Sequence, residues 1–178
     1  MNLLIINGYS ASGKSTLSLK FAKKHDYALI IQDHFLFKMN PSSLKTKKPN
    51  SFNHEITQIN LLSCIENYMK YKRDILIEGA LVSITNTDPI DISDFVNLAK
   101  KYEYTTTIIS LVANEKVRKQ RQKKRGNTLP KRTDKKLVDA AEKQYSKFNN
   151  HRIDTTKSSI TKSLEEIEKI VINNDEVK

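Results

Sequence analysis

Residues 8–15 read Gly8-Tyr9-Ser10-Ala11-Ser12-Gly13-Lys14-Ser15, a full match to the phosphate-cradling pattern G-x-x-x-x-G-K-[ST]. The two glycines let the backbone turn tightly, so that successive N–H groups point inward at phosphate oxygens. The Lys14 ammonium is suited to the β- and γ-phosphates, and the Ser15 hydroxyl to Mg²⁺. A helix from about Lys14 to Lys24 would aim the positive end of its dipole at the same anion.

The sequence around this loop has the strand-before and helix-after context that the motif requires. An apolar run from Leu3 to Ile6 precedes the loop, and Leu17, Leu19, Phe21 and Ala22 follow it within the helix. A Gly/Ser surface turn is the plainer interpretation of such a match, and the context argues against it. We therefore expect the chain to bind ATP and Mg²⁺. The expected nucleotide-binding residues of the loop are Gly8, Ser10, Ala11, Ser12, Gly13, Lys14, Ser15 and Thr16.

The overall composition predicts a single domain. A chain of 178 residues can bury a sizeable core, and no repeat or boundary divides it, so we expect one domain over residues 1–178. Cys64 is the one cysteine, which rules out an intramolecular disulfide framework and suits a reducing compartment. The sequence has no targeting segment and no apolar run of membrane-spanning length, so a cytoplasmic protein with no membrane partner is expected.

The net charge of +11 is concentrated in one stretch. Between Glu115 and Lys136 only Glu115 and Asp134 are acidic, whereas eleven residues are basic: Lys116, Arg118, Lys119, Arg121, Lys123, Lys124, Arg125, Lys131, Arg132, Lys135 and Lys136. Such a block can be a solvated helix face, a nucleic-acid patch or a clamp for phosphates. Because a phosphate loop is already present, we interpret residues 115–136 as a basic lid over the nucleotide.

The remaining sequence alternates strand-like and helix-like segments, which predicts an α/β fold with a mostly parallel, five-stranded sheet flanked by helices. After the first strand, the expected strands are Tyr27–Ile31, Ile75–Ile77, Thr105–Val112 and Arg152–Asp154. Helices are expected over 14–24, over 55–71, around Phe95 and Leu98, from Glu115 onward, over Leu137 to Phe148, and near Ser163, where Glu166 three residues on suggests a capping box. Loops are expected over 38–53 and 83–90.

Two acidic residues directly follow predicted strands, Asp33 after the second and Glu78 after the third. The carboxyl ends of neighbouring parallel strands share one crevice, so both carboxylates should face the bound phosphates. A carboxylate at the end of the second strand suits a general base, and the other can hold Mg²⁺ directly or through water. The plainer interpretations are a turn-initiating aspartate and a glutamate that caps a helix or turn.

The phosphate loop, Gln32-Asp33-His34-Phe35, Ile77-Glu78-Gly79 and the basic lid together resemble a P-loop kinase. Gln32 to Lys38 is similar to the end of the second strand in the uridine kinase and nicotinamide riboside kinase group, in which the aspartate is the acceptor-side base. Ser51-Phe52-Asn53-His54 resembles the segment with which uridine kinases contact their nucleoside. Ile75 to Gly79 and Arg152 to Thr156 are similar to zeta toxins and polynucleotide 5′-kinases.

The residues and this resemblance lead us to expect a P-loop NTPase fold and a kinase that moves the γ-phosphoryl group of ATP to a hydroxyl of a small, nucleoside-like acceptor. The expected catalytic residues are Lys14, Asp33, Arg121 and Arg125, with Arg118 binding nucleotide and Ser15 and Glu78 as metal ligands. The spacing of the arginines fits more than one of them as the group that neutralises charge on the transferred phosphoryl group.

Two other functions stay open on the sequence alone. One is a kinase acting on polynucleotide 5′-hydroxyls or nucleotide-sugars, with nucleic acid as the partner of the basic lid. Residues 115–136 contain no aromatic side chain on which bases could stack, which favours a small-molecule acceptor. The other is an NTP-dependent binding or switch protein without enzymatic activity.

Overall fold

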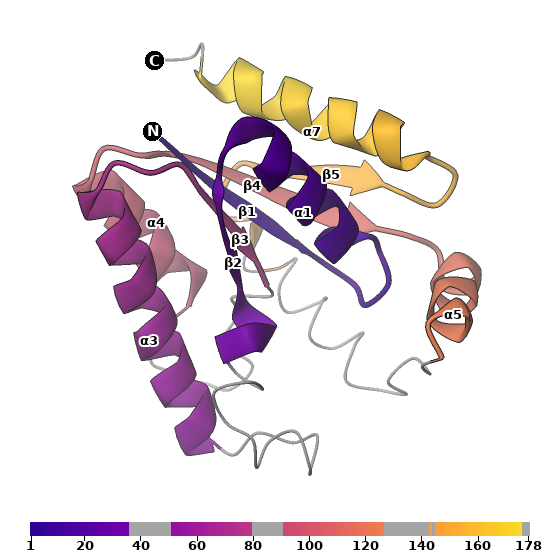
Figure 1. Cartoon of the computed structure of the whole chain (residues 1–178), viewed down its shortest axis with the longest axis horizontal. Helices are drawn as coiled ribbons and strands as arrows, with labels where there is room; N and C mark the ends of the chain where they lie inside the picture. The colour runs from indigo at the N-terminus through magenta and orange to yellow at the C-terminus, as the bar shows by residue number, and fades with distance from the viewer. Residues whose placement is uncertain (36–50, 80–90, 127–142, 144, 176–178) are drawn as a thin grey trace.

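In the computed structural model, five parallel strands form one sheet that carries helices on both faces (Figure 1). The structure describes residues 1–35, 51–79, 91–126, 143 and 145–175, with the backbone alone for 51–55 and 175. The strands are β1 (Asn2–Gly8), β2 (Ala28–Ile31), β3 (Ile75–Glu78), β4 (Thr105–Val112) and β5 (Asn150–Asp154). The helices are α1 (Lys14–His25), α3 (Ser51–Lys70), α4 (Ile92–Lys101), α5 (Glu115–Lys124) and α7 (Ile160–Asp175).

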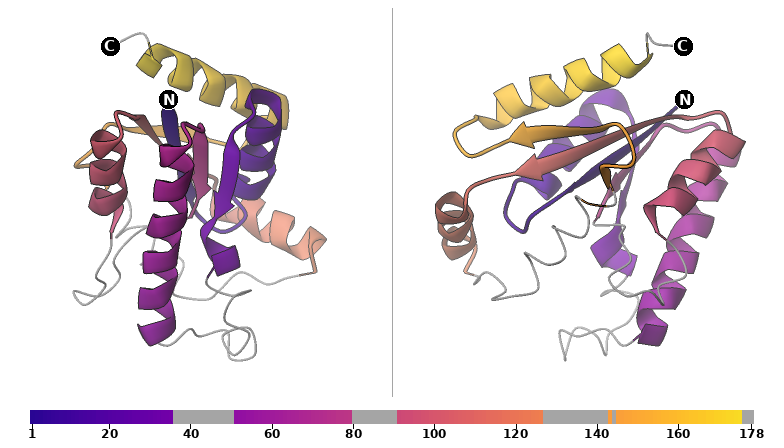
Figure 2. Two further views of the ribbon diagram at one scale, coloured as in Figure 1. Left: turned by 60° about the vertical axis from the view of Figure 1, so that its left-hand side comes forward. Right: turned by 180° about the vertical axis from the view of Figure 1, so that it is seen from behind.

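The strand order β2-β3-β1-β4-β5 places β1 at the centre of the sheet. Residues 3–6 of β1 are fully buried, as expected for a strand that is covered on both faces. Helices α1 and α7 cover one face of the sheet, and α3 and α4 lie on the other (Figures 1 and 2). Successive side chains of β1 point to opposite faces of the sheet and so belong to two separate cores. Leu4 and Ile6 pack toward α1 and α7, and Leu3 and Ile5 pack toward α3 and α4.

On the α3 and α4 side, the sheet changes from apolar to polar side chains at its carboxyl edge. The strand register aligns one apolar row across four strands: Ile30, Ile77, Ile5 and Ile108. Two residues further along β1 and β4, Asn7 lies opposite Ser110, while Gln32 and Gly79 directly follow the last residues of β2 and β3. The Asn7 Nδ2 donates a hydrogen bond of 2.7 Å to the Ser110 Oγ. The apolar core thus stops one row before the edge at which ligands bind in parallel sheets.

The α/β fold and the five strands of the sheet confirm the sequence prediction, but two boundaries were wrong. Residues 51–53, expected as loop, form the first turn of α3. Ser163 does not begin the last helix: it is buried inside α7, and the Ser159 Oγ instead accepts a hydrogen bond of 3.1 Å from the Lys162 N–H. Ser163 has the right spacing to Glu166 for a capping box, but it faces the core, and the chain already has a cap four residues earlier.

Two further predicted elements lie largely outside the described residues. Most of the predicted helix over Leu137 to Phe148 lies outside them, as does the loop over 83–90. Tyr145 is fully buried in the core beside α3 and α4, and its burial raises the pKa of its phenol, whereas the chain has left helical geometry by Phe148. Among the described helices, none combines the length and the apolar character needed to cross a bilayer.

Gly8 ends β1 at a point where no side chain can be accommodated. Its φ of +141° lies outside the range of L-residues, and a Cβ built there would lie 2.0 Å from the Leu111 carbonyl oxygen on β4. Gly126 also has a positive φ, +71°, but open space surrounds the position of its missing Cβ. Substitutions at these two glycines therefore distinguish the cost of backbone strain from the cost of a steric clash.

We predict that Gly8→Ala lowers the free energy of unfolding by about 3 kcal/mol or more, because β1 and β4 must separate. Gly126→Ala, the matched control, should cost only about 1–2 kcal/mol, since strain is its sole penalty. Urea unfolding followed by circular dichroism measures both values. Equal losses in the two variants would contradict the role assigned to the Leu111 contact.

Candidate nucleotide site

The loop between β1 and α1 is shaped to receive an anion. Gly8, Ala11 and Gly13 all adopt positive φ, and the Ser12 N–H closes a turn on the Tyr9 carbonyl at 3.1 Å. Gly13 is the N-cap of α1, and no side chain of the described residues caps this helix end. The first turn of α1 also lacks acidic residues. The N–H groups at this helix end and the positive helix dipole consequently point into the loop, an arrangement that binds phosphate.

Lys14 contributes the positive charge of the loop. Its Nζ donates hydrogen bonds to the Gly8 carbonyl at 2.9 Å and to the Tyr9 carbonyl at 3.0 Å. The side chain therefore folds back over the loop that precedes it instead of extending into solvent. This position holds an ammonium at the mouth of the loop, as the sequence predicted for a phosphate-binding lysine.

Ser15 and Glu78 meet at the edge of the sheet, as a shared metal site requires. The Ser15 Oγ donates to the Glu78 Oε1 at 2.7 Å. Glu78 is only 6% exposed, and its Oε2 is buried with no hydrogen-bond partner among the described residues. A hydroxyl beside a carboxylate with a vacant oxygen fits Mg²⁺, which prefers oxygen ligands. Within the described ranges no cluster of three or more His, Cys, Asp or Glu forms, so phosphate oxygens and water would complete the shell.

Arg121 of α5 links the loop to the segment after β5. Its guanidinium donates to the Ala11 carbonyl at 3.2 Å, to the Thr155 Oγ1 at 3.1 Å and to the Thr155 carbonyl at 2.7 Å. Burial, and then the nearby Arg125 guanidinium, lower the pKa of Arg121. The side chain stays protonated, because an arginine begins so far above neutrality. In this structure Arg121 thus positions the strained Ala11 segment of the loop.

Thr155 completes that link from the opposite side. Its hydroxyl lies 2.6 Å from the Ser12 carbonyl and 3.1 Å from the Val112 carbonyl, while its N–H donates to Val112 at 2.8 Å. One side chain therefore joins the phosphate loop, the end of β4 and the turn after β5. The sequence prediction missed this residue. The detectable signal was its place directly after the last strand, at the shared carboxyl edge.

Two further contacts hold α5 beside the loop. The Arg118 guanidinium lies 4.5 Å from the centre of the Tyr9 ring, a cation–π distance, and its Nη1 is 3.5 Å from the Ser10 carbonyl. The Gln122 Nε2 donates to the Ser10 Oγ at 2.7 Å. The structure thus brings Arg118 and Arg121 to the loop, as the lid interpretation expected. Arg125 lies at the exposed C-cap of α5, and most of the remaining lid, 127–136, falls outside the described residues.

Asp33 lies on another part of the same edge. It follows β2 in a helical segment that begins at Gln32, and its side chain is exposed. Strand β3 separates β2 from β1, so about 10 Å lies between Asp33 and the start of the phosphate loop at the usual strand spacing. Gly79 lets Gln32 approach closely, since a Cβ at Gly79 would lie 2.6 Å from the Gln32 Cβ. Within the described chain, no hydrogen bond or ion pair engages the Asp33 carboxylate.

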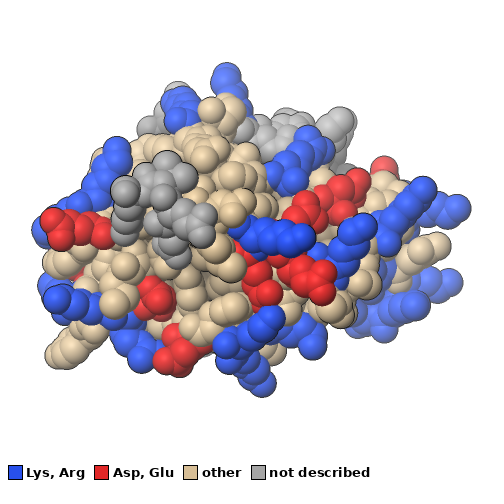
Figure 3. Space-filling view, turned by 90° about the horizontal axis from the view of Figure 1, so that it is seen from above, with Lys and Arg blue, Asp and Glu red and all other residues tan. Residues whose placement is uncertain are grey.

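The distribution of charge agrees with an anion site at the α5 end. Figure 3 shows basic side chains gathered at its right-hand end, the end where Figure 1 places α5. Along the middle of that face, acidic and basic side chains alternate. Glu168 of α7 pairs with Lys24 at 2.7 Å and with His25 at 2.9 Å, both of α1, and the Lys24 hydrogen bond is the main cause that lowers the pKa of Glu168.

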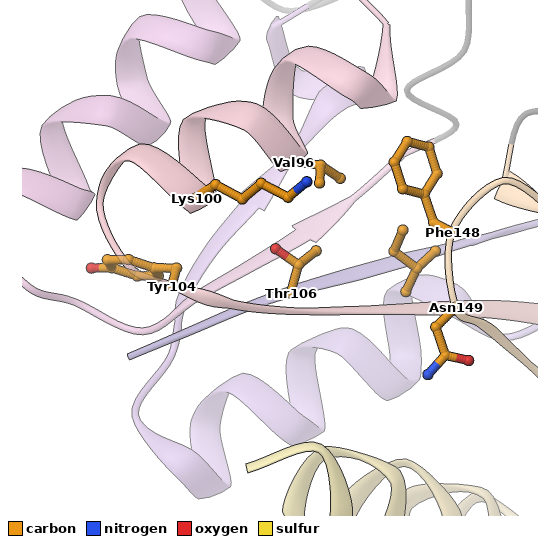
Figure 4. Close-up of a pocket in the computed structure, with 7 residues that line it drawn as sticks. Val96, Lys100, Tyr104, Thr106, Phe148 and Asn149 are labelled. Carbon is orange, nitrogen blue, oxygen red and sulfur yellow. The ribbon is translucent and has the colours of Figure 1, made fainter. Parts of the chain in front are cut away.

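A separate pocket of about 290 Å³ opens near the amino ends of the strands (Figure 4). It is lined by Val96 and Lys100 of α4, by Thr106 of β4 and by Phe148 and Asn149 before β5. Its position next to the first residues of β4 puts it at the opposite end of the sheet from the phosphate loop. Ligands of parallel α/β sheets bind at the carboxyl ends, so the phosphate loop remains the candidate functional site.

The comparisons with known proteins address the family and the fold of the chain. A family model described as an AAA domain matches residues 3–149, which includes the phosphate loop, Asp33, Glu78 and α5. The chain belongs to this AAA domain family. No curated protein matches the sequence.

Solved kinases share the fold of this AAA domain. A sugar kinase from Janibacter sp. superposes with a TM-score of 0.71 at 15% identity, covering 96% of this chain and 94% of that one. A gluconokinase from Sinorhizobium meliloti gives 0.67 at 15% identity, covering 99% and 95%. A deoxyadenosine kinase from M. mycoides with bound dATP gives 0.59 at 19% identity, covering 94% and 97%. The fold is therefore that of P-loop NTPase kinases, while the resemblance to uridine and nicotinamide riboside kinases, zeta toxins and polynucleotide kinases stays a prediction.

We predict that Thr155→Val, which keeps the shape of the side chain but removes its hydroxyl, costs about 1–3 kcal/mol of stability, because the Ser12 carbonyl loses its donor. ATP affinity should fall as well, since the Ala11–Ser12 segment loses an anchor. Thr155→Ser is the matched control and should retain both properties. Chemical denaturation and isothermal titration calorimetry with ATP test the pair. A valine variant of normal ATP affinity would show that the hydroxyl does not position the loop.

Proposed function

We propose that this protein is an ATP-dependent kinase that transfers the γ-phosphoryl group to a hydroxyl of a small, nucleoside-like acceptor. The observation that carries the proposal is the meeting of Ser15 with Glu78 beside a loop whose N–H groups and Lys14 ammonium face the same space. The AAA domain match and the kinases that share the fold support it. We further propose that residues 1–178 form one domain in which residues 115–136 act as the basic lid.

The proposed chemistry needs positioning and charge stabilisation more than covalent help. The loop N–H groups and Lys14 bind the phosphates of ATP and stabilise the negative charge that develops on the transferred group. Ser15 and Glu78 would hold Mg²⁺, which supplies charge neutralisation between the phosphates. Arg118 and Arg121 lie close enough to the loop for the lid to contribute further positive charge, and Arg125 is the more exposed candidate.

Asp33 is the proposed acceptor-side base. Its exposed carboxylate lies about 10 Å from the phosphate loop, a gap that an acceptor hydroxyl and a γ-phosphate would fill together. The carboxylate would accept the hydroxyl proton as the oxygen attacks phosphorus in line. Strand β3, which ends beside Gly79, lies between β2 and β1, so the strand order itself sets the distance between donor and acceptor.

An acceptor screen tests the proposed activity. Wild-type protein with ATP and Mg²⁺ should release ADP when supplied with a nucleoside, and Lys14→Ala should abolish turnover without unfolding, since Lys14 contacts the loop and not the core. Lys20→Ala, an exposed lysine on the same helix, is the control and should behave as wild type. ADP release is followed with nucleosides, sugars, vitamins and oligonucleotide ends as acceptors. Near-normal turnover in folded Lys14→Ala would refute the kinase assignment.

The role of Asp33 predicts a different pattern. Asp33→Asn keeps the size of the side chain but cannot take a proton, so turnover at saturating ATP should fall about 10²-fold or more. ATP binding should be unchanged, because the side chain is remote from the loop. Glu165→Gln on exposed α7 controls for the loss of one negative charge. If ATP affinity collapses while turnover at saturation persists, Asp33 is a metal-binding or structural residue instead.

A further inference from the structure

Gln58 on α3 has a buried amide group that forms no hydrogen bond with the described residues. The side chain is 1% exposed, and neither its Nε2 nor its Oε1 has a hydrogen-bond partner among the described residues. Buried polar groups in folded proteins are almost always paired, so each exception needs a physical reason. An unsatisfied donor and acceptor in one side chain favour a ligand that supplies both partners.

The position of Gln58 places its amide on the acceptor side of the sheet. It precedes Leu61 by three residues and Ile65 by seven, and both of these pack into the core between α3 and the sheet, so Gln58 shares their face of the helix. The Tyr104 hydroxyl, directly before β4, donates to the Arg73 carbonyl at 2.9 Å. The C-terminal end of α3 therefore lies at the amino edge of the sheet, and α3 runs back toward the carboxyl edge.

Simple lengths put Gln58 near that edge. The eleven residues from Met69 back to Gln58 span about 16 Å of helix. The four steps from Ile75 to Gly79 span about 13 Å of strand. In the direction of the carboxyl edge, Gln58 therefore lies just beyond the last apolar turn of α3. Gln32, Gly79 and Asn7 likewise lie just beyond the last apolar row of the sheet.

The described side chains that share this face with Gln58 are neutral. Asn7 is 1% exposed, and Gln32, Thr57 and Ser110 are buried as well. The acidic Glu78 points to the other face, where it meets Ser15 of α1. Apart from the proposed base Asp33, the α3 side therefore offers uncharged hydrogen-bonding groups, and the ATP side carries the other charges.

We propose that Gln58 binds an uncharged edge of the phosphoryl-acceptor molecule. This edge carries a hydrogen-bond donor and a hydrogen-bond acceptor side by side, as a nucleobase does. A carboxamide pairs with such an edge through two parallel hydrogen bonds. A carboxylate or phosphate offers acceptors alone and would leave the Gln58 Oε1 unsatisfied in a buried place. This inference rests on the proposed function for the location of the acceptor, and it assigns that acceptor to the nucleosides rather than to sugar acids.

Binding to the wild-type protein in the presence of ADP and Mg²⁺ is the first test. Isothermal titration calorimetry with adenosine, guanosine, cytidine, uridine and thymidine should reveal at least one ligand. Gluconate, shikimate and glucose should bind about ten-fold more weakly or not at all, since their hydroxyls rotate freely and do not form a rigid, planar donor–acceptor edge. Tighter binding of any of these three, or no binding by all five nucleosides, would overturn the inference.

Variants of Gln58 separate recognition from folding. Gln58→Met removes an unpaired amide at nearly constant volume, so the free energy of unfolding should stay the same or rise. Nucleoside affinity should nevertheless fall about 10- to 100-fold, and ADP affinity should be unchanged. Gln58→Glu should weaken nucleoside binding similarly, and Asn67→Asp, the same change at an exposed position of α3, is its control. A methionine variant that is destabilised but binds nucleoside normally would make Gln58 a structural residue and refute the proposal.

The outcomes also separate this inference from the proposed function. A nucleoside that binds in a Gln58-dependent manner without being phosphorylated would refute the kinase activity and leave the recognition role standing. Phosphorylation of an acceptor with the same KM in wild type and Gln58→Met would support the kinase and refute the role of Gln58.

Discussion

The close approach of β1 to β4 at Gly8 is the constraint on which the site depends. The absence of a side chain at Gly8 lets the backbone pass against the Leu111 carbonyl and leave the sheet at its centre. From this point the loop turns through two more positive φ values into α1. A displaced exit would move the N–H groups, the Lys14 ammonium and the Ser15 hydroxyl together. One steric fact thus sets the location of the whole anion site.

The loop is then held in shape by groups distant in sequence. Ala11 adopts a left-handed conformation that alanine ordinarily avoids, and its carbonyl accepts a hydrogen bond from Arg121. The next carbonyl, that of Ser12, lies 2.6 Å from the Thr155 hydroxyl. Strain of this kind persists only where the surroundings impose it. Here α5 and the turn after β5 impose it, so α5 and the loop form one mechanical unit.

Because side chains alternate along each strand, the two faces of the sheet contribute different residues to the site. On β3, Glu78 points toward α1 and the phosphate loop, whereas its neighbour Gly79 belongs to the row that faces α3. Charged groups accordingly gather where a nucleotide would bind, whereas the α3 face places neutral amides beside the proposed base Asp33. Because successive residues of a strand point to opposite faces, two adjacent positions can serve two different ligands.

The sequence by itself determined the elements whose causes are local. The apolar runs of β1 and β4, the helix after Gly13 and the phosphate loop all follow from neighbouring residues, and the structure has each of them. The capping box at Ser163 was wrong because burial, a tertiary property, competes with a local signal. Only the tertiary structure decided which residues meet: Thr155 with Ser12, Arg121 with Ala11, and Ser15 with Glu78. These contacts join positions tens to more than a hundred residues apart, and strand order and register, which sequence periodicity does not encode, bring them together.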